Sequence, residues 1–67
     1  MKIILNGASK EFPTEHLNLQ QLLDHLVIPA GRVACEVNLK IIKRAFYLST
    51  VLNEGDTVEI IQAIGGG

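Results

Sequence analysis

The chain has 67 residues, of which 48% are hydrophobic, and its six basic and seven acidic residues give a net charge of −1. This length allows one domain with an aliphatic core but no deep substrate pocket of several hundred cubic ångströms, so we do not expect an enzyme. The balanced charge lacks the basic stripe typical of nucleic-acid binding, and we expect no nucleic-acid partner.

The single cysteine and the first residues indicate the compartment. Cys35 alone cannot form an internal disulfide or a zinc site, which fits a reducing compartment. Its place in an alternating segment predicts a small buried hydrophobe, and His16 and His25, without metal-ligand spacing, are predicted to be solvated. The apolar run at residues 3–5 is too short for a signal peptide or a membrane helix. We therefore predict a cytoplasmic protein with no membrane partner.

Two short strands open the chain. Residues 2–5 are apolar and rich in isoleucine, and residues 8–12 return as a second strand. Asn6-Gly7 lies between them and favours a type I′ turn, because both residues tolerate a positive φ. The sequence thus begins with a predicted β-hairpin.

The next segment has helical periodicity. One apolar stripe follows the spacing i, i+3, i+4, i+7 and i+8, and it consists of Leu19, Leu22, Leu23, Leu26 and Val27. Asn18 is a suitable N-cap, with Gln21 three residues later as in a capping box. Pro29 and Gly31 are predicted to end the helix. Its polar opposite face indicates a helix that covers something on one side only.

The second half of the chain contains three further predicted strands. Residues 33–37 alternate, with Val33, Cys35 and Val37 facing one way. Asn38-Leu39 is expected to turn the chain into a short strand at residues 40–42. A brief helical turn is predicted at residues 44–48, and a final strand at residues 57–62.

The order of these elements predicts an α+β fold with the β-grasp, or ubiquitin-like, architecture. In this fold a mixed sheet of four to five strands carries one main helix packed on one face. Two hairpins flank the helix, and the last strand lies centrally. The connection through the helix is long enough to permit parallel pairing of the second and third strands.

The chain ends in Ile64-Gly65-Gly66-Gly67, directly after the final predicted strand. Glycine has no Cβ, so such residues can lie extended in a channel too narrow for a side chain. They leave the Gly67 carboxylate as an accessible acyl group. We predict a domain over residues 1–64 and a flexible glycine tail over residues 65–67. A frayed terminus without a function is the alternative interpretation.

Together these features resemble the family of small sulfur carriers of thiamine biosynthesis (ThiS), over the whole chain. In the first part of the chain the resemblance rests on the strand that closes in Asn6-Gly7, on the leucine pairs of the helix and on Val33-Ala34 leading into Asn38. Arg44 and Val51 follow. The last part is Leu52-x-x-Gly55-Asp56-x-Val58-Glu59-Ile60, followed by the terminal glycines. In two places the chain departs from the family pattern. Leu39 stands where glycine often follows the asparagine, and Lys43 stands where proline often precedes the arginine.

The resemblance implies a carrier that is a protein substrate and not an enzyme. A ubiquitin-activating-like adenylyltransferase would use ATP to activate the Gly67 carboxylate, which would become a thiocarboxylate. Gly65 and Gly66 would enter the partner's active site. A desulfurase system would supply sulfur ultimately from cysteine, and a thiazole synthase would receive it. The chain itself has no G-x-x-x-x-G-K-[ST] phosphate-binding loop, so we expect adenylation in trans, no bound cofactor or metal, and a free monomer.

We also expect a partner-binding patch on the sheet face that the helix leaves open. Alternation along the final strand predicts that Ile61 and Ala63 point away from the core, with Ile61 beside Ile4. Ile64 and Arg44 complete the patch. Alternatively, the two isoleucines only pack on each other, and Arg44 bridges to Glu36 or Glu59.

Three other functions stay open. The small subunit of molybdopterin synthase uses the same chemistry, but that family tends to be longer and to carry phenylalanine and proline before the glycines, which Gln62-Ala63-Ile64 lacks. A ubiquitin-like protein modifier shares the activation chemistry as far as the adenylate. A plain β-grasp interaction module would not need Gly66 and Gly67 at all.

Overall fold

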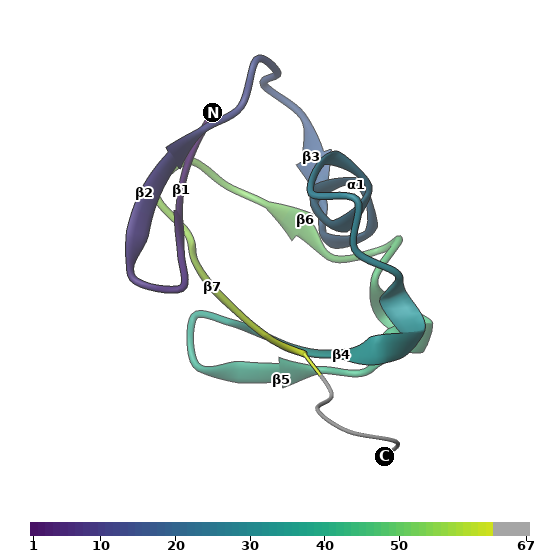
Figure 1. The fold of residues 1–67 in the computed structure, drawn as a ribbon. Coiled ribbons are helices and arrows are strands. Elements are labelled where there is room, and N and C mark those ends of the chain that lie inside the picture. The colour runs from purple at the N-terminus through teal and green to yellow at the C-terminus, as the bar shows by residue number, and fades with distance from the viewer. Residues whose placement is uncertain (63–67) are drawn as a thin grey trace.

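The computed structural model describes residues 1–62 and contains a five-stranded sheet with one α-helix on one face. The sheet order is β2-β1-β7-β4-β5, with β7 in the centre (Figure 1). The strands of this sheet are β1 Lys2–Leu5, β2 Ala8–Glu11, β4 Val33–Val37, β5 Lys40–Ile42 and β7 Thr57–Gln62. The mixed sheet, its central last strand and the single covering helix confirm the predicted β-grasp fold.

The first hairpin forms as predicted. Asn6 has φ 48° and Gly7 has φ 82°, the positive values that a type I′ turn requires at both central positions. Leu5 pairs with Ala8 across the turn. Strand β2 ends at Glu11, one residue before the predicted end, and all four of its residues are exposed. It is therefore an edge strand.

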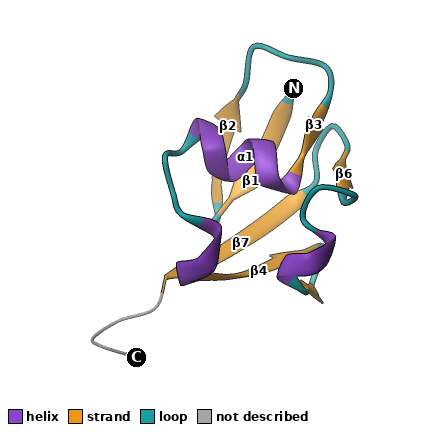
Figure 2. Ribbon diagram, turned by 90° about the vertical axis from the view of Figure 1, so that its right-hand side faces the viewer, coloured by secondary structure: helices purple, strands orange, loops and turns teal. Residues whose placement is uncertain are grey.

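Helix α1 (Leu19–His25) begins at the predicted N-cap. The Asn18 side chain accepts a hydrogen bond from the Gln21 backbone amide at 2.8 Å, and the Gln21 side chain accepts one from the Asn18 amide at 2.9 Å. This is the complete capping box. The helix lies across one face of the sheet (Figure 2), and Leu19, Leu22 and Leu23 are fully buried there.

The predicted apolar stripe extends too far, because Val27 lies beyond the helix and is 86% exposed. Leu26 is the C-cap, and Val27 adopts a φ of 57°. The Val27 amide donates to the Asp24 carbonyl and the Ile28 amide donates to the Leu23 carbonyl. These two bonds form a Schellman motif, which ends the helix before Pro29. The left-handed position is normally taken by glycine, and here a β-branched residue occupies it.

Strand β7 organises the core. It runs parallel to β1, with Ile4 opposite Thr57, and antiparallel to β4, with Cys35 opposite Ile60. The parallel pairing of the second and third predicted strands, which the length of the connection permits, does not occur. The hairpin places β2 on the outer edge of β1 and leaves the inner edge to β7. The side chains facing α1 from the sheet are Ile3, Leu5, Cys35, Val37, Val58 and Ile60.

A second, two-stranded sheet was not predicted. Strands β3 (Leu17–Asn18) and β6 (Val51–Leu52) pair antiparallel beside α1, with Leu17 opposite Leu52. Both leucines are buried, so this small sheet closes one end of the core. Two 3₁₀ helices complete the fold: η1 (Ala30–Arg32) and η2 (Arg44–Phe46). Helix η2 confirms the brief helical turn predicted at residues 44–48, although it ends at Phe46.

The β4–β5 hairpin turns at Asn38-Leu39, as predicted. Both residues have positive φ, 50° and 71°, so the turn uses the same left-handed pair as the first hairpin. Leu39 therefore occupies a position at which a residue with a Cβ is strained by about 1–2 kcal/mol. The Asn38 side chain offsets part of this strain, because its Oδ1 accepts from the Thr57 amide at 3.0 Å and its Nδ2 donates to Asp56 at 3.1 Å.

Candidate functional site

The candidate site surrounds the C-terminal end of β7, which is the last described element. Gln62 is the final residue of this strand. The predicted patch residues Ala63 and Ile64 and the predicted glycine tail, Gly65, Gly66 and Gly67, lie outside the described residues. The structure thus describes the part of the domain from which the C-terminal segment continues.

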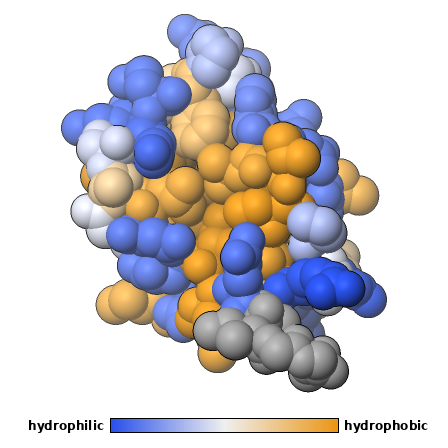
Figure 3. All heavy atoms as spheres, viewed as in Figure 1, coloured by the Kyte–Doolittle hydropathy of each residue, from blue (hydrophilic) through white to orange (hydrophobic). Residues whose placement is uncertain are grey.

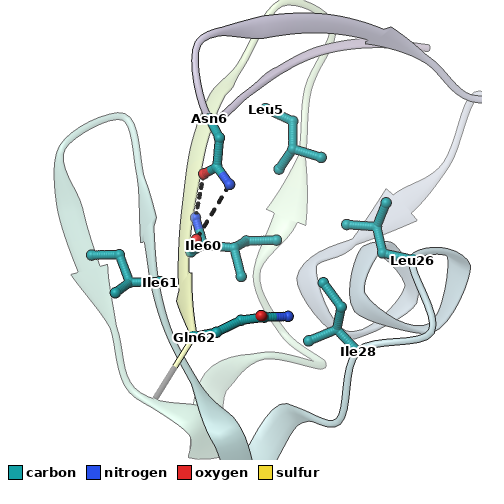
Figure 4. A pocket seen from close by; sticks show the side chains of 7 residues that line it. All are labelled: Leu5, Asn6, Leu26, Ile28, Ile60, Ile61 and Gln62. Carbon is teal, nitrogen blue, oxygen red and sulfur yellow. Dashed lines mark hydrogen bonds between the residues drawn. The ribbon is translucent and has the colours of Figure 1, made fainter. Parts of the chain in front are cut away.

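Asn6 fixes the end of β7 through its side chain. The parallel ladder between the two strands runs from the Ile4 amide to the Asp56 carbonyl and from the Asn6 amide to the Val58 carbonyl, both at 2.9 Å. Strand β1 then ends, and the Asn6 side chain continues the ladder. Its Oδ1 accepts from the Ile60 amide at 2.8 Å, and its Nδ2 donates to the Ile60 carbonyl at 3.3 Å (Figure 4).

This role of Asn6 was not predicted. The sequence showed Asn6 only as a turn residue, because its bond partner is 54 positions away along the chain. Only the presence of asparagine at the first turn position could have indicated this role, because its side-chain amide can form the hydrogen bonds of a backbone peptide unit. Asn6 is therefore a positioning residue for the last three residues of β7.

An open groove lies between this strand end and the end of α1. Its volume is about 600 Å³ and it is lined by Leu5, Asn6, Leu26, Ile28, Ile60, Ile61 and Gln62. Space of this size was not expected, and it exists because the groove lies on the surface between helix and sheet. The same side of the molecule shows a central apolar area bordered by hydrophilic residues (Figure 3). None of these seven described residues is ionisable, so they offer an apolar contact surface and no acid, base or nucleophile.

The side chains at the end of β7 alternate as predicted. Figure 4 shows the side chains of Ile60 and Gln62 on the groove side of the strand and the side chain of Ile61 on the opposite side, so Ile61 borders the groove without pointing into it. Ile61 is 59% exposed. The expected neighbour relation with Ile4 is wrong, because Ile4 is opposite Thr57 and Ile61 is opposite Ala34. Glu59 lies between the two isoleucines on the same face.

Arg44 is exposed at the start of η2. The alternative that it bridges to Glu36 or Glu59 is wrong, because within residues 1–62 the single ion pair joins the Met1 amino group and Glu11 at 3.2 Å. The guanidinium lies instead against the backbone of Gly31, where an added Cβ would come within 2.9 Å of Nη1.

Cys35 and the two histidines show no reactive arrangement. Cys35 is fully buried, and burial raises the pKa of its thiol, an effect that the neighbouring Tyr47 hydroxyl only partly offsets. The raised pKa keeps the sulfur a neutral thiol, as predicted for a small buried hydrophobe. The exposed His25 ring packs edge-on against Phe12 with centroids 5.7 Å apart. Within residues 1–62 no group of three metal-ligating side chains is found.

Tyr47 is expected to limit stability at alkaline pH. Burial, followed by the interaction with Cys35, raises the pKa of Tyr47 to about 12 from its ordinary value of 10.0. The neutral phenol therefore contributes its full stabilisation below pH ~10, and this contribution is lost as the pH rises toward 12.

The chain has one tyrosine and no tryptophan, so tyrosinate absorbance reports on Tyr47 alone. We expect the absorbance midpoint to lie well above that of free tyrosine and to coincide with the loss of far-ultraviolet circular dichroism. Tyr47→Phe keeps the ring but removes this part of the pH dependence. Ionisation at the ordinary pKa, with the fold retained, would contradict the prediction.

In the described part of the chain, no helix is both long and apolar enough to cross a membrane.

Comparison with known proteins gives consistent similarities. A model of the ThiS family matches residues 3–67. The crystal structure of a thiamine biosynthesis protein (ThiS) from Geobacter metallireducens superimposes with a TM-score of 0.87 and 32% identity, covering 100% of both chains. A thiazole synthase from Paramagnetospirillum magneticum is 36% identical over all 67 residues of this chain, which correspond to 20% of that protein. The protein ycf40 of Porphyra purpurea is 41% identical over 54 residues, 81% of this chain and 76% of that protein. The chain thus spans about a fifth of the thiazole synthase that it matches.

Proposed function

Since this chain belongs to the ThiS family, we propose that it is a sulfur carrier of thiamine biosynthesis whose Gly67 carboxylate is converted to a thiocarboxylate. The observation that carries this proposal is the family match over residues 3–67, which includes the three glycines. The whole-length similarity to the Geobacter metallireducens protein supports it. The carrier works in the cytoplasm as a monomer and binds no cofactor of its own.

The chemistry assigns the activation step to a partner. A terminal carboxylate has a pKa near about 3.5, so it is an anion at neutral pH and a poor electrophile. An ATP-dependent adenylyltransferase joins it to AMP and releases pyrophosphate. The terminal sulfur of a desulfurase persulfide then attacks the acyl carbon and the bond to AMP breaks, which leaves an acyl disulfide. A thiol cleaves the S–S bond and is itself oxidised to a disulfide, so that a thiocarboxylate remains. A thiazole synthase consumes that sulfur.

The described residues supply a fixed starting point for the tail. Two hydrogen bonds between the Asn6 side chain and the Ile60 backbone hold the strand two residues before the last described position. Five further residues span at most about 17 Å when extended, which is enough to enter a partner's active site while the domain stays outside. Gly65 and Gly66 pass a narrow channel because they have no Cβ.

Partner docking is proposed on the sheet face opposite α1 and around the end of β7. Ile61 is exposed there, and Ile4 lies half-buried farther along the same face. Ala63 and Ile64 follow Ile61 in the sequence and are proposed to extend the contact. The guanidinium of Arg44 forms no ion pair within residues 1–62, which favours a contact with an acidic group of a partner.

Intact-protein mass spectrometry tests the proposal. The chain is incubated with its adenylyltransferase, ATP and a sulfur source, or isolated from cells that make their own thiamine. The expected result is the mass gain of one oxygen replaced by sulfur, located to Gly67. Isopeptide conjugates to lysines would identify a ubiquitin-like modifier instead. An unmodified Gly67 with no adenylate formed would identify a plain binding module.

The matched control is a chain with one alanine added after Gly67. It keeps every described contact but moves the carboxylate onto a residue with a side chain. The proposal predicts that this variant gains no sulfur.

A further inference from the structure

Two carboxylates lie directly opposite each other on the outer face of the sheet, the face turned away from α1. Glu36 on β4 pairs with Glu59 on β7, and both are half-buried. Cross-strand partners have Cβ atoms about 5 Å apart, and like charges at this distance weaken the pairing of the strands. Neither carboxylate takes part in an ion pair within residues 1–62. The fold therefore carries an uncompensated acidic pair in the middle of its sheet.

The surroundings of this pair are apolar. Ile41 on β5 is opposite Glu36 and is 77% exposed, and Ile61 follows Glu59 on the same face of β7. Ala34 is opposite Ile61. Lys2, the basic residue on the same face of β1, is opposite Glu11 and lies four residues along the strands from Glu59, about 13 Å away. Lys43 and Arg44, which follow β5, form no ion pair with either carboxylate.

An exposed apolar face with a central pair of negative charges complements a surface of defined chemistry. An arginine side chain has a planar fork of donors that can contact two neighbouring carboxylates, and it desolvates more readily than lysine. An arginine of a partner therefore matches the acidic pair.

We infer that the outer sheet face docks onto the activating enzyme through a basic side chain of that enzyme, placed between Glu36 and Glu59, with apolar side chains against Ile41 and Ile61. This inference rests on the proposed function, because that function names the enzyme. The acidic pair is then compensated only in the complex.

Binding of the full chain to its adenylyltransferase tests this interface. Isothermal titration calorimetry at ~50 and ~300 mM salt compares the original chain with Glu36→Gln, Glu59→Gln and the double variant. Each single change is expected to raise the Kd about fivefold and the double change more than tenfold, with a weaker salt dependence. Glu15→Gln is the matched control, because Glu15 is exposed before β3 and the charge change is identical. It is expected to leave the Kd unchanged.

Thermal unfolding tests whether weaker binding of a variant results from lost folding. Removing one of two facing charges is expected to leave the melting temperature unchanged or to raise it, so weaker binding cannot come from lost folding. A double variant that binds as tightly as the Glu15→Gln control would overturn the inference. Measuring pyrophosphate release distinguishes a failure of this inference from a failure of the proposed function. If the original chain is adenylated and the double variant has the same KM, only this inference fails, whereas an original chain that is never adenylated overturns the proposed function and the inference with it.

Discussion

Leu22→Ala is expected to lower the free energy of unfolding by about 2–5 kcal/mol, the range for removing a fully buried leucine side chain. Leu22 has no exposed surface and lies in the middle of α1, between the helix and the sheet. A domain of this size has a total stability of only roughly 3–10 kcal/mol. The variant therefore loses a large part of its stability, and a substantial fraction is unfolded at moderate temperature.

Urea denaturation followed by circular dichroism measures this loss. The matched control is Val27→Gly, at a position that the apolar periodicity places on the same stripe. Because Val27 is exposed at φ 57°, its side chain contributes no burial and strains the left-handed position. Glycine removes that strain, and we expect the control to be about 1 kcal/mol more stable than the original chain. A loss below about 1 kcal/mol for Leu22→Ala would show that the core under the helix tolerates the cavity.

Local chemical signals predicted most of the fold. The turn at Asn6-Gly7, the capping box at Asn18 and Gln21, and the alternation of residues 33–37 each determine a backbone conformation from neighbouring residues, and all three are confirmed. The prediction for Val27 is wrong because the apolar spacing continues past the helix into the Schellman turn, where Val27 takes the left-handed position. A β-branched residue rarely adopts a positive φ, so the sequence does not predict one at this position.

Features that depend on distant pairing were not predictable. Strands β3 and β6 have two residues each, too few for any periodicity, and they form only because Leu17 and Leu52 meet at the end of the core. The register that places Glu36 opposite Glu59, and the one that separates Ile4 from Ile61, both follow from the position of β7. The predictions for residues 63–67 lie outside the described residues and remain predictions.

Asn6→Ala is expected to destabilise the protein by about 2–5 kcal/mol. The two hydrogen bonds to Ile60 account for about 1–3 kcal/mol of this, and an alanine at φ 48° adds about 1–2 kcal/mol of strain. Asn6→Gly separates the two terms, because glycine adopts the positive φ without strain but lacks the side-chain amide. We expect the glycine variant to lose only the hydrogen-bond part.

The Asn6→Gly variant also tests the link between fold and function. The Ile60 amide donates to Asn6 Oδ1, so its hydrogen exchange is expected to become at least about tenfold faster, while the Asn38 amide, which donates to the Thr57 carbonyl in the same sheet, serves as the internal reference. A loosened end of β7 presents the tail less precisely, so we expect a higher KM in adenylation, with the domain still folded. Unchanged exchange at Ile60 would show that the end of β7 is held by its pairing with β4 alone. Asn6 would then stabilise only the first turn and would not position the carrier tail.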